Sequence, residues 1–94
     1  MNVARLTIGF RLRGCASLKD KRRRLAKLRD KFGRQTGLAV CESDYADDLR
    51  RSEWGFVACA SDARIVEQTL AEVERYVALA VDGEVVSMQR TWLN

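Results

Sequence analysis

The residues with the clearest chemical potential lie between positions 17 and 34, where the segment SLKDKRRRLAKLRDKFGR holds nine lysines and arginines against two aspartates. The remainder of the chain carries eight basic and eleven acidic residues, out of totals of 17 and 13. The net charge of +4 therefore separates into +7 on this segment and −3 elsewhere. Such a concentration of cations suits the phosphates of a nucleic-acid backbone, which attract lysine and arginine by charge.

The basic residues begin early in the helix that this segment predicts. The first turns of a helix already present partial positive charge, so each cation placed there costs about 0.3–1 kcal/mol, and an anion bound at that end relieves the cost. Two arginines at the end of the preceding predicted strand extend the same basic corner. The predicted phosphate-binding residues are Arg11, Arg13, Lys19, Lys21, Arg22, Arg23 and Lys27. Such residues hold the backbone and carry no base-reading information by themselves.

The same run also fits the solvated outer face of a helix packed on a sheet. Lysine and arginine are good helix formers, and the pairs Asp20–Arg24 and Asp30–Arg34 stand four residues apart, each worth about 0.3–0.5 kcal/mol. Lys21 falls on the side of the helical wheel that carries the apolar residues. Its ammonium must therefore extend to the rim or meet a partner there, and extension to the rim is the favoured interpretation.

Residue types that support catalysis or metal binding are scarce. The chain has no histidine, which removes the usual general base and the commonest zinc ligand. Its three cysteines form no C-x-x-C pair, and the thiol of Cys15, just before the predicted helix, has no histidine to activate it. We therefore expect no enzymatic activity, no cofactor, no metal and no small-molecule substrate.

Acidic residues gather around the predicted hairpin between the second and third strands. A divalent cation needs several converging oxygens, and the spacing of these residues matches no calcium-binding loop. The side chains are interpreted as solvated, or as a surface that binds the basic corner of a second copy. They are Glu42, Asp44, Asp47, Asp48 and Glu53.

The segment WGFVA, residues 54–58, partly matches the aromatic core of an RNA-recognition motif. In that motif the aromatic rings face outward and stack on bases. The predicted first strand offers no aromatic residue on its polar face, so Trp54 and Phe56 are interpreted as core residues.

The spacing of apolar residues predicts four strands and two helices. Strict alternation near the N-terminus is typical of a half-buried strand, and Ser17 with Asp20 forms a capping box that begins a helix. The predicted elements are a strand at 3–13, a helix that starts at Ser17 and has Gly37 as its stop, strands at 38–43 and 53–61, a helix that begins at Ser61 or Asp62, and a strand at 84–93.

The order β-α-β-β-α-β is the signature of the ferredoxin-like α+β fold. We expect one domain over residues 1–94, with a four-stranded antiparallel sheet, both helices on one face and the first strand central. The last strand mixes apolar and polar residues and is predicted at an edge. Because edge strands invite pairing between subunits, a homodimer is expected.

The chain shows neither a signal-peptide pattern at its start nor an apolar run of about 20 residues, the length that crosses a bilayer. The cysteines are interpreted as reduced thiols. These features predict a cytoplasmic protein with no membrane partner.

The sequence resembles the YlxP-like family of small bacterial proteins along its whole length. The resemblance is most specific in SLKDKR at residues 17–22, followed by Val40, Glu42 and Asp44 together with Glu53 and Gly55. It implies a compact ferredoxin-like domain. The genes of this family often lie beside translation and ribosome-maturation genes, which implies contact with RNA or the ribosome.

Two positions depart from the family pattern. Ala16 stands where the family has a polar residue, often histidine, and the loop near Leu49 lacks an expected tryptophan. The sequence as a whole predicts a non-enzymatic RNA-contacting or ribosome-contacting domain. The alternative is a protein-interaction module or a homo-oligomeric structural protein that uses the same basic helix against an acidic surface.

Overall fold

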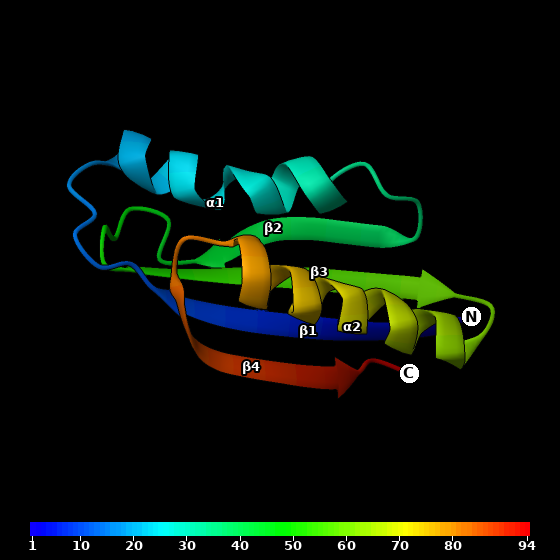
Figure 1. Cartoon of the computed structure of the whole chain (residues 1–94). Coiled ribbons are helices and arrows are strands. Elements are labelled where there is room, and N and C mark those ends of the chain that lie inside the picture. Colours follow the sequence, from blue (N-terminus) through cyan, green and yellow to red (C-terminus); the bar gives the residue numbers. More distant parts are fainter.

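The computed structural model describes all 94 residues and has the predicted order of elements (Figure 1). The elements are β1 (Asn2–Arg11), α1 (Leu18–Phe32), β2 (Leu38–Asp44), β3 (Arg51–Ala60), α2 (Ala63–Ala80) and β4 (Glu84–Trp92). The ferredoxin-like α+β fold is therefore confirmed.

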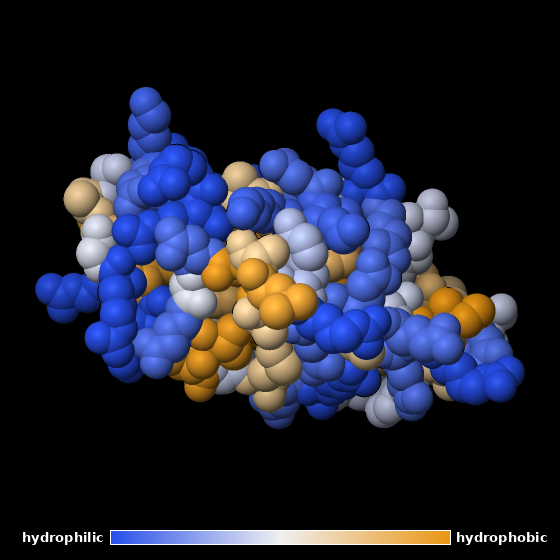
Figure 2. Space-filling view, in the orientation of Figure 1, coloured by the Kyte–Doolittle hydropathy of each residue, from blue (hydrophilic) through white to orange (hydrophobic).

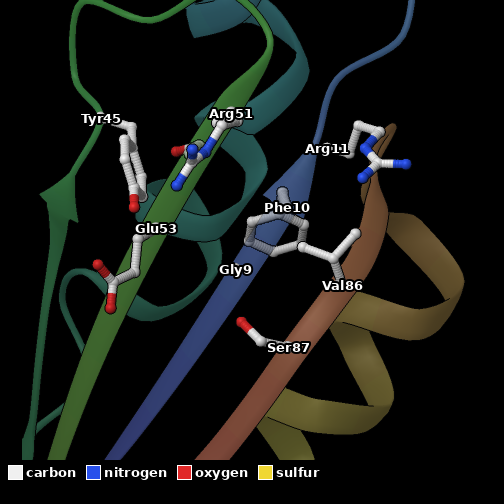
Figure 3. A pocket seen from close by; sticks show the side chains of 9 residues that line it. Gly9, Phe10, Arg11, Tyr45, Arg51, Glu53, Val86 and Ser87 are labelled. Atoms are coloured by element: carbon white, nitrogen blue, oxygen red, sulfur yellow. The ribbon is translucent and has the colours of Figure 1, made fainter.

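The four strands form one antiparallel sheet in the order β2-β3-β1-β4. This order places β1 in the interior of the sheet and β4 at an edge, as predicted. Both helices cover the same face, and the other face is free of secondary structure (Figures 1 and 3). The end of β1, the start of α1, the loop between β2 and β3 and the starts of β3 and β4 all meet at one end of the molecule, on the left in Figure 1.

The core lies between the sheet and the two helices. Alternate residues of β1 and β3 point into it, as period-two spacing requires, and each helix contributes one apolar stripe. The ring of Phe32 on α1 meets those of Phe56 and Tyr76 edge to face. Trp54 and Phe56 are buried, which confirms that the WGFVA segment belongs to the core. The buried apolar residues of the strands include Ala4, Leu6, Ile8, Phe10 and Ala58, and those of the helices include Leu25, Leu28, Val66, Leu70, Val73 and Val77.

The start of α1 has one half of the predicted capping box, the bond to the Ser17 side chain, and lacks the other half, a bond from the chain to the Asp20 carboxylate. The side-chain oxygen of Ser17 accepts a hydrogen bond from the backbone N–H of Asp20, at 3.1 Å. The carboxylate of Asp20, however, pairs with Arg23 and Arg24. Asp62, not Ser61, caps α2.

The predicted helix stop at Gly37 is wrong. Helix α1 ends at Phe32, and Gly33 caps it by donating its N–H to the carbonyl of Arg29. Gly37 has another role, because its φ of 81° turns the chain into β2 and its carbonyl accepts from the N–H of Cys59. A Cβ there would lie 2.9 Å from the Cys59 carbonyl oxygen, so glycine is required by both conformation and space.

The edge strand β4 is covered on neither face. Met88 and Trp92 pair with Ile8 and Ala4 in the antiparallel register and so lie on the helix side of the sheet. They are nonetheless 41% and 47% exposed, because α2 packs over β1 and β3. Figure 2 shows apolar surface where β4 begins, at the lower left, and over the C-terminal part of α2, while the surface over α1 is largely hydrophilic.

Candidate nucleic-acid interface

Four arginines line one hollow at the end of the sheet where β1 stops and β3 begins. The hollow has a volume of about 450 Å³. A backbone hydrogen bond of 2.8 Å from the N–H of Leu12 to the carbonyl of Arg50 holds the two segments together. We call these residues the arginine cluster: Arg11, Arg13, Arg50 and Arg51.

The arginine cluster has little internal neutralisation. The cross-strand neighbours of Arg11 are Arg51 on β3, where like charges destabilise a sheet, and Glu84 on β4, with which Arg11 forms no ion pair. Arg13 pairs with Glu84 at 3.4 Å, with both side chains largely exposed, so this ion pair is weak. No ion pair joins Arg11, Arg50 or Arg51 to a carboxylate. The cluster therefore presents an excess of positive charge to solvent.

Arg50 and Arg51 were not among the predicted binding residues. The sequence does show two arginines directly before the predicted third strand. Their approach to Arg11, however, depends on the register of β1 against β3, which pairs Arg11 with Arg51. Period-two alternation leaves the register open to shifts of two residues, so the sequence does not fix this pairing.

Lys21 does not belong to the exposed basic surface, which corrects the sequence prediction for this residue. Only 3% of it is exposed. Its ammonium donates to the carbonyls of Tyr45, Ala46 and Asp48, the last two at 3.2 and 2.7 Å, and lies 3.1 Å from the carboxylate of Glu42. The ammonium thus meets partners under the β2–β3 loop and does not extend to the rim. We call this arrangement the Lys21 cage.

The other bases of α1 divide into free and paired ones. Lys19 and Arg22 are exposed and form no ion pair. Arg23 hydrogen-bonds to Asp20, which is the main reason why the pKa of that carboxyl lies below its ordinary value, and Arg24 adds to the effect. Lys27 is exposed and donates to the carbonyl of Ala80 at the end of α2, at 3.4 Å.

Arg24 is the least exposed arginine of this group. It pairs with Asp20 at 3.0 Å and lies 3.8 Å from Asp82, and it donates to the carbonyl of Arg13 at 2.6 Å. It therefore fastens α1 to the turn that carries Arg13. The start of α1 and the backbone segments that carry the arginine cluster lie at the same end of the molecule (Figure 1).

Three of the five acidic residues at the β2–β3 hairpin, Glu42, Asp44 and Asp48, have partners within the chain. Glu42 accepts a hydrogen bond from the Ser52 hydroxyl and forms an ion pair with Lys21. Asp44 accepts from the N–H of Tyr45, and Asp48 from the N–H of Arg50. No three aspartate, glutamate or cysteine side chains gather as a metal site would require. The hairpin acids thus shape the loop that ends in the arginine cluster.

The fold defines the class as a ferredoxin-like α+β domain. Residues 3–90 match the family described as "Protein of unknown function (DUF503)", and the chain belongs to that family. None of the curated proteins matches the chain significantly. Neither helix is long and apolar enough to cross a membrane.

Two solved structures share the fold. The structural-genomics protein YJCS superposes with a TM-score of 0.61 at 12% identity, over 98% of this chain and 99% of its own. The de novo designed protein Ferredog-Diesel gives a TM-score of 0.53 at 17% identity, over 95% of this chain and 83% of its own. Identities this low establish the common fold alone.

Proposed function

We propose that this protein is a non-enzymatic, YlxP-like RNA-contacting domain, associated with the ribosome in the cytoplasm. The arginine cluster is the observation that carries the proposal. Three of its four guanidinium groups have no carboxylate partner, and RNA phosphate is the abundant polyanion that such a surface fits.

Guanidinium groups suit this task better than ammonium groups. Each presents a planar fork of N–H donors that matches two phosphate oxygens. The arginines of the cluster come from two segments that a backbone hydrogen bond holds together, so the spacing of the two backbones is set before a ligand binds. Lys19 and Arg22 extend the surface along α1. Contacts of this kind fix position and recognise shape rather than base sequence.

The test is the salt dependence of RNA binding. With about four phosphates engaged, log K should fall against log salt with a slope of roughly −3. The double variant Arg11→Gln/Arg50→Gln should bring the slope closer to zero by roughly 1.5, because two phosphate contacts are lost. The matched control is Arg34→Gln/Arg75→Gln, which removes two exposed arginines that form no ion pair and lie outside the cluster. Equal slopes for the two double variants would refute the proposal.

A second function, self-association, is favoured by the exposed edge of the sheet. Strand β4 offers unpaired backbone groups together with the exposed apolar side chains of Met88 and Trp92. Pairing of two copies along β4 would cover both. Light scattering coupled to gel filtration should then give a dimer mass for the native protein and a monomer mass for Met88→Lys. Leu79→Lys, at an exposed position on α2, is the control and should remain dimeric. A native monomer at high concentration would exclude this function.

A further inference from the structure

A recess of about 370 Å³ opens on the helix-free face of the sheet and adjoins the arginine cluster (Figure 3). Its floor is the backbone of β1 at Gly9. One side carries Arg51 and Glu53 with Tyr45 beside them, and the other carries Val86 and Ser87. Arg11 and Arg51 line both the recess and the arginine cluster, so the two sites are continuous.

Gly9 leaves the floor of the recess without a side chain, and the hydroxyl of Ser87 lies over it. Gly9 pairs with Glu53 on one side and with Ser87 on the other, and a Cβ at this position would come within 2.3 Å of the Ser87 hydroxyl oxygen. A bulge follows at once, since Gly9 pairs with Ser87 but the next residue pairs with Val85. Val86 is the extra residue of the bulge, and it forms part of the rim. Bulges of this kind re-aim side chains beside binding sites.

Tyr45 carries the aromatic wall of the recess, and hydrogen bonds hold its backbone. Tyr45 has a φ of 61°, in the left-handed region that non-glycine residues enter at a cost of about 1–3 kcal/mol. Its carbonyl accepts from Lys21 and its N–H donates to Asp44, and these bonds offset the cost. The guanidinium carbon of Arg51 lies 3.8 Å from the centre of the Tyr45 ring. The wall thus consists of an aromatic ring with a guanidinium group over it.

We propose that the recess binds the base of an unpaired nucleotide whose phosphate lies on the arginine cluster. This inference rests on the proposed function and names the part of the RNA that is recognised. A base can continue the stack on the Arg51 plane, as single-stranded bases do on arginine and aromatic side chains. Arg11, at the boundary between the two sites, is placed for the phosphate.

The polar groups of the recess favour one base. Glu53 forms no ion pair, and an ionised carboxylate only accepts hydrogen bonds. Guanine offers two adjacent N–H donors on its Watson–Crick edge, which one carboxylate can accept together. In a duplex that edge is paired and stacked, so the recess selects unpaired nucleotides. The ligand class is a guanine nucleotide, either free or within a single strand.

Calorimetry with simple probes separates the base from the phosphate. GMP should bind at least tenfold more tightly than ribose 5-phosphate, and more tightly than UMP. A guanine-containing single strand should bind more tightly than a duplex of equal length. If GMP binds tightly and the single strand binds weakly, the recess is assigned to free nucleotides. If the single strand binds tightly, the recess is assigned to RNA. Equal binding of GMP and ribose 5-phosphate overturns the inference, while an intact salt slope would leave the proposed function standing.

Tyr45 supplies matched variants. Asparagine tolerates the left-handed conformation, so Tyr45→Asn removes the ring and keeps the turn, whereas Tyr45→Phe keeps the ring. Tyr45→Asn should lose the tenfold preference for GMP over ribose 5-phosphate and retain the salt slope, and Tyr45→Phe should retain both. An unchanged preference in Tyr45→Asn contradicts the inference. In the native protein, GMP should shift the backbone amide NMR signals of Gly9 and Ser87. Unchanged signals would contradict the inference without the need for a variant.

Discussion

The buried Lys21 and the exposed arginine cluster lie at the same end of the molecule, but their positive charges meet different partners. The ammonium of Lys21 is enclosed by three carbonyls and the carboxylate of Glu42. Arg11, Arg50 and Arg51 are exposed and meet no carboxylate. The first cation is satisfied by its own chain, whereas the others are available to a partner.

The comparison shows that a charge run cannot be read as one functional unit. Lys21 lies between the exposed bases Lys19 and Arg22 in the sequence, yet its own side chain is buried and contacts other groups of the chain. It also supports the exposed group, because the loop that it holds runs from Tyr45 directly into Arg50 and Arg51. A structural cation thus positions the cations that we propose to bind RNA.

The largest effect is expected where the enclosed cation is removed. Lys21→Met should lower the free energy of unfolding by about 3–5 kcal/mol, because the Glu42 carboxylate loses its opposite charge and three carbonyls lose the ammonium donor. Lys19→Met, two residues earlier on an exposed position, should change it by no more than about 0.5 kcal/mol. Denaturant unfolding measures both.

A double variant tests the cause of that loss. In Lys21→Met/Glu42→Gln the unpaired carboxylate is gone, so part of the stability should return. If Lys21→Met is as stable as the native protein, the Lys21 cage contributes nothing and the contrast with the arginine cluster disappears.

A smaller effect is expected from the free bases on α1. Lys19→Gln/Arg22→Gln should reduce the salt slope of RNA binding by less than Arg11→Gln/Arg50→Gln does, since the helix bases flank the cluster rather than line its hollow. Side-by-side titrations of the two double variants at several salt concentrations give the ranking. The reverse ranking would move the centre of the interface from the sheet end to the helix.

The smallest effect concerns the exposed pair of Asp20 and Arg23. The hydrogen bond from Arg23 lowers the pKa of Asp20 below its ordinary value of 3.8. The resulting stabilisation is present above the ordinary pKa and is lost as the pH falls through the lowered one. Arg23→Ala should raise the pKa of Asp20 towards 3.8, as carboxyl NMR titration would show. Asp62, whose pKa is lowered by Arg64, should not respond. A constant Asp20 pKa would assign the shift to Arg24.

Much of the fold could be predicted because the spacing of apolar residues and the order of the elements can be read directly from the sequence. The alternation that begins at Ala4 identifies the buried face of β1, and the aromatic residues at Trp54 and Phe56 identify that of β3. The stop of α1 was misplaced because two glycines follow the helix. Gly33 ends it in ordinary right-handed backbone, while the left-handed Gly37 belongs to the next strand's entry.

The candidate site was predicted only in part, because its contacts are not local. The partners of Lys21 are backbone carbonyls in a loop 24 to 27 residues away, and no pattern of side chains predicts them. Arg51 joins Arg11 through strand register. The recess at Gly9 depends on a bulge in another strand, which period-two reasoning does not reveal.

The burial of Lys21 also distinguishes it chemically. The chain has four lysines, and the other three, at positions 19, 27 and 31, are exposed. Amine-reactive reagents such as acetic anhydride should therefore label those three in the native protein and spare Lys21. The rate at which Lys21 becomes acylated, measured by mass spectrometry, would then report how often α1 separates from the β2–β3 loop in the native protein.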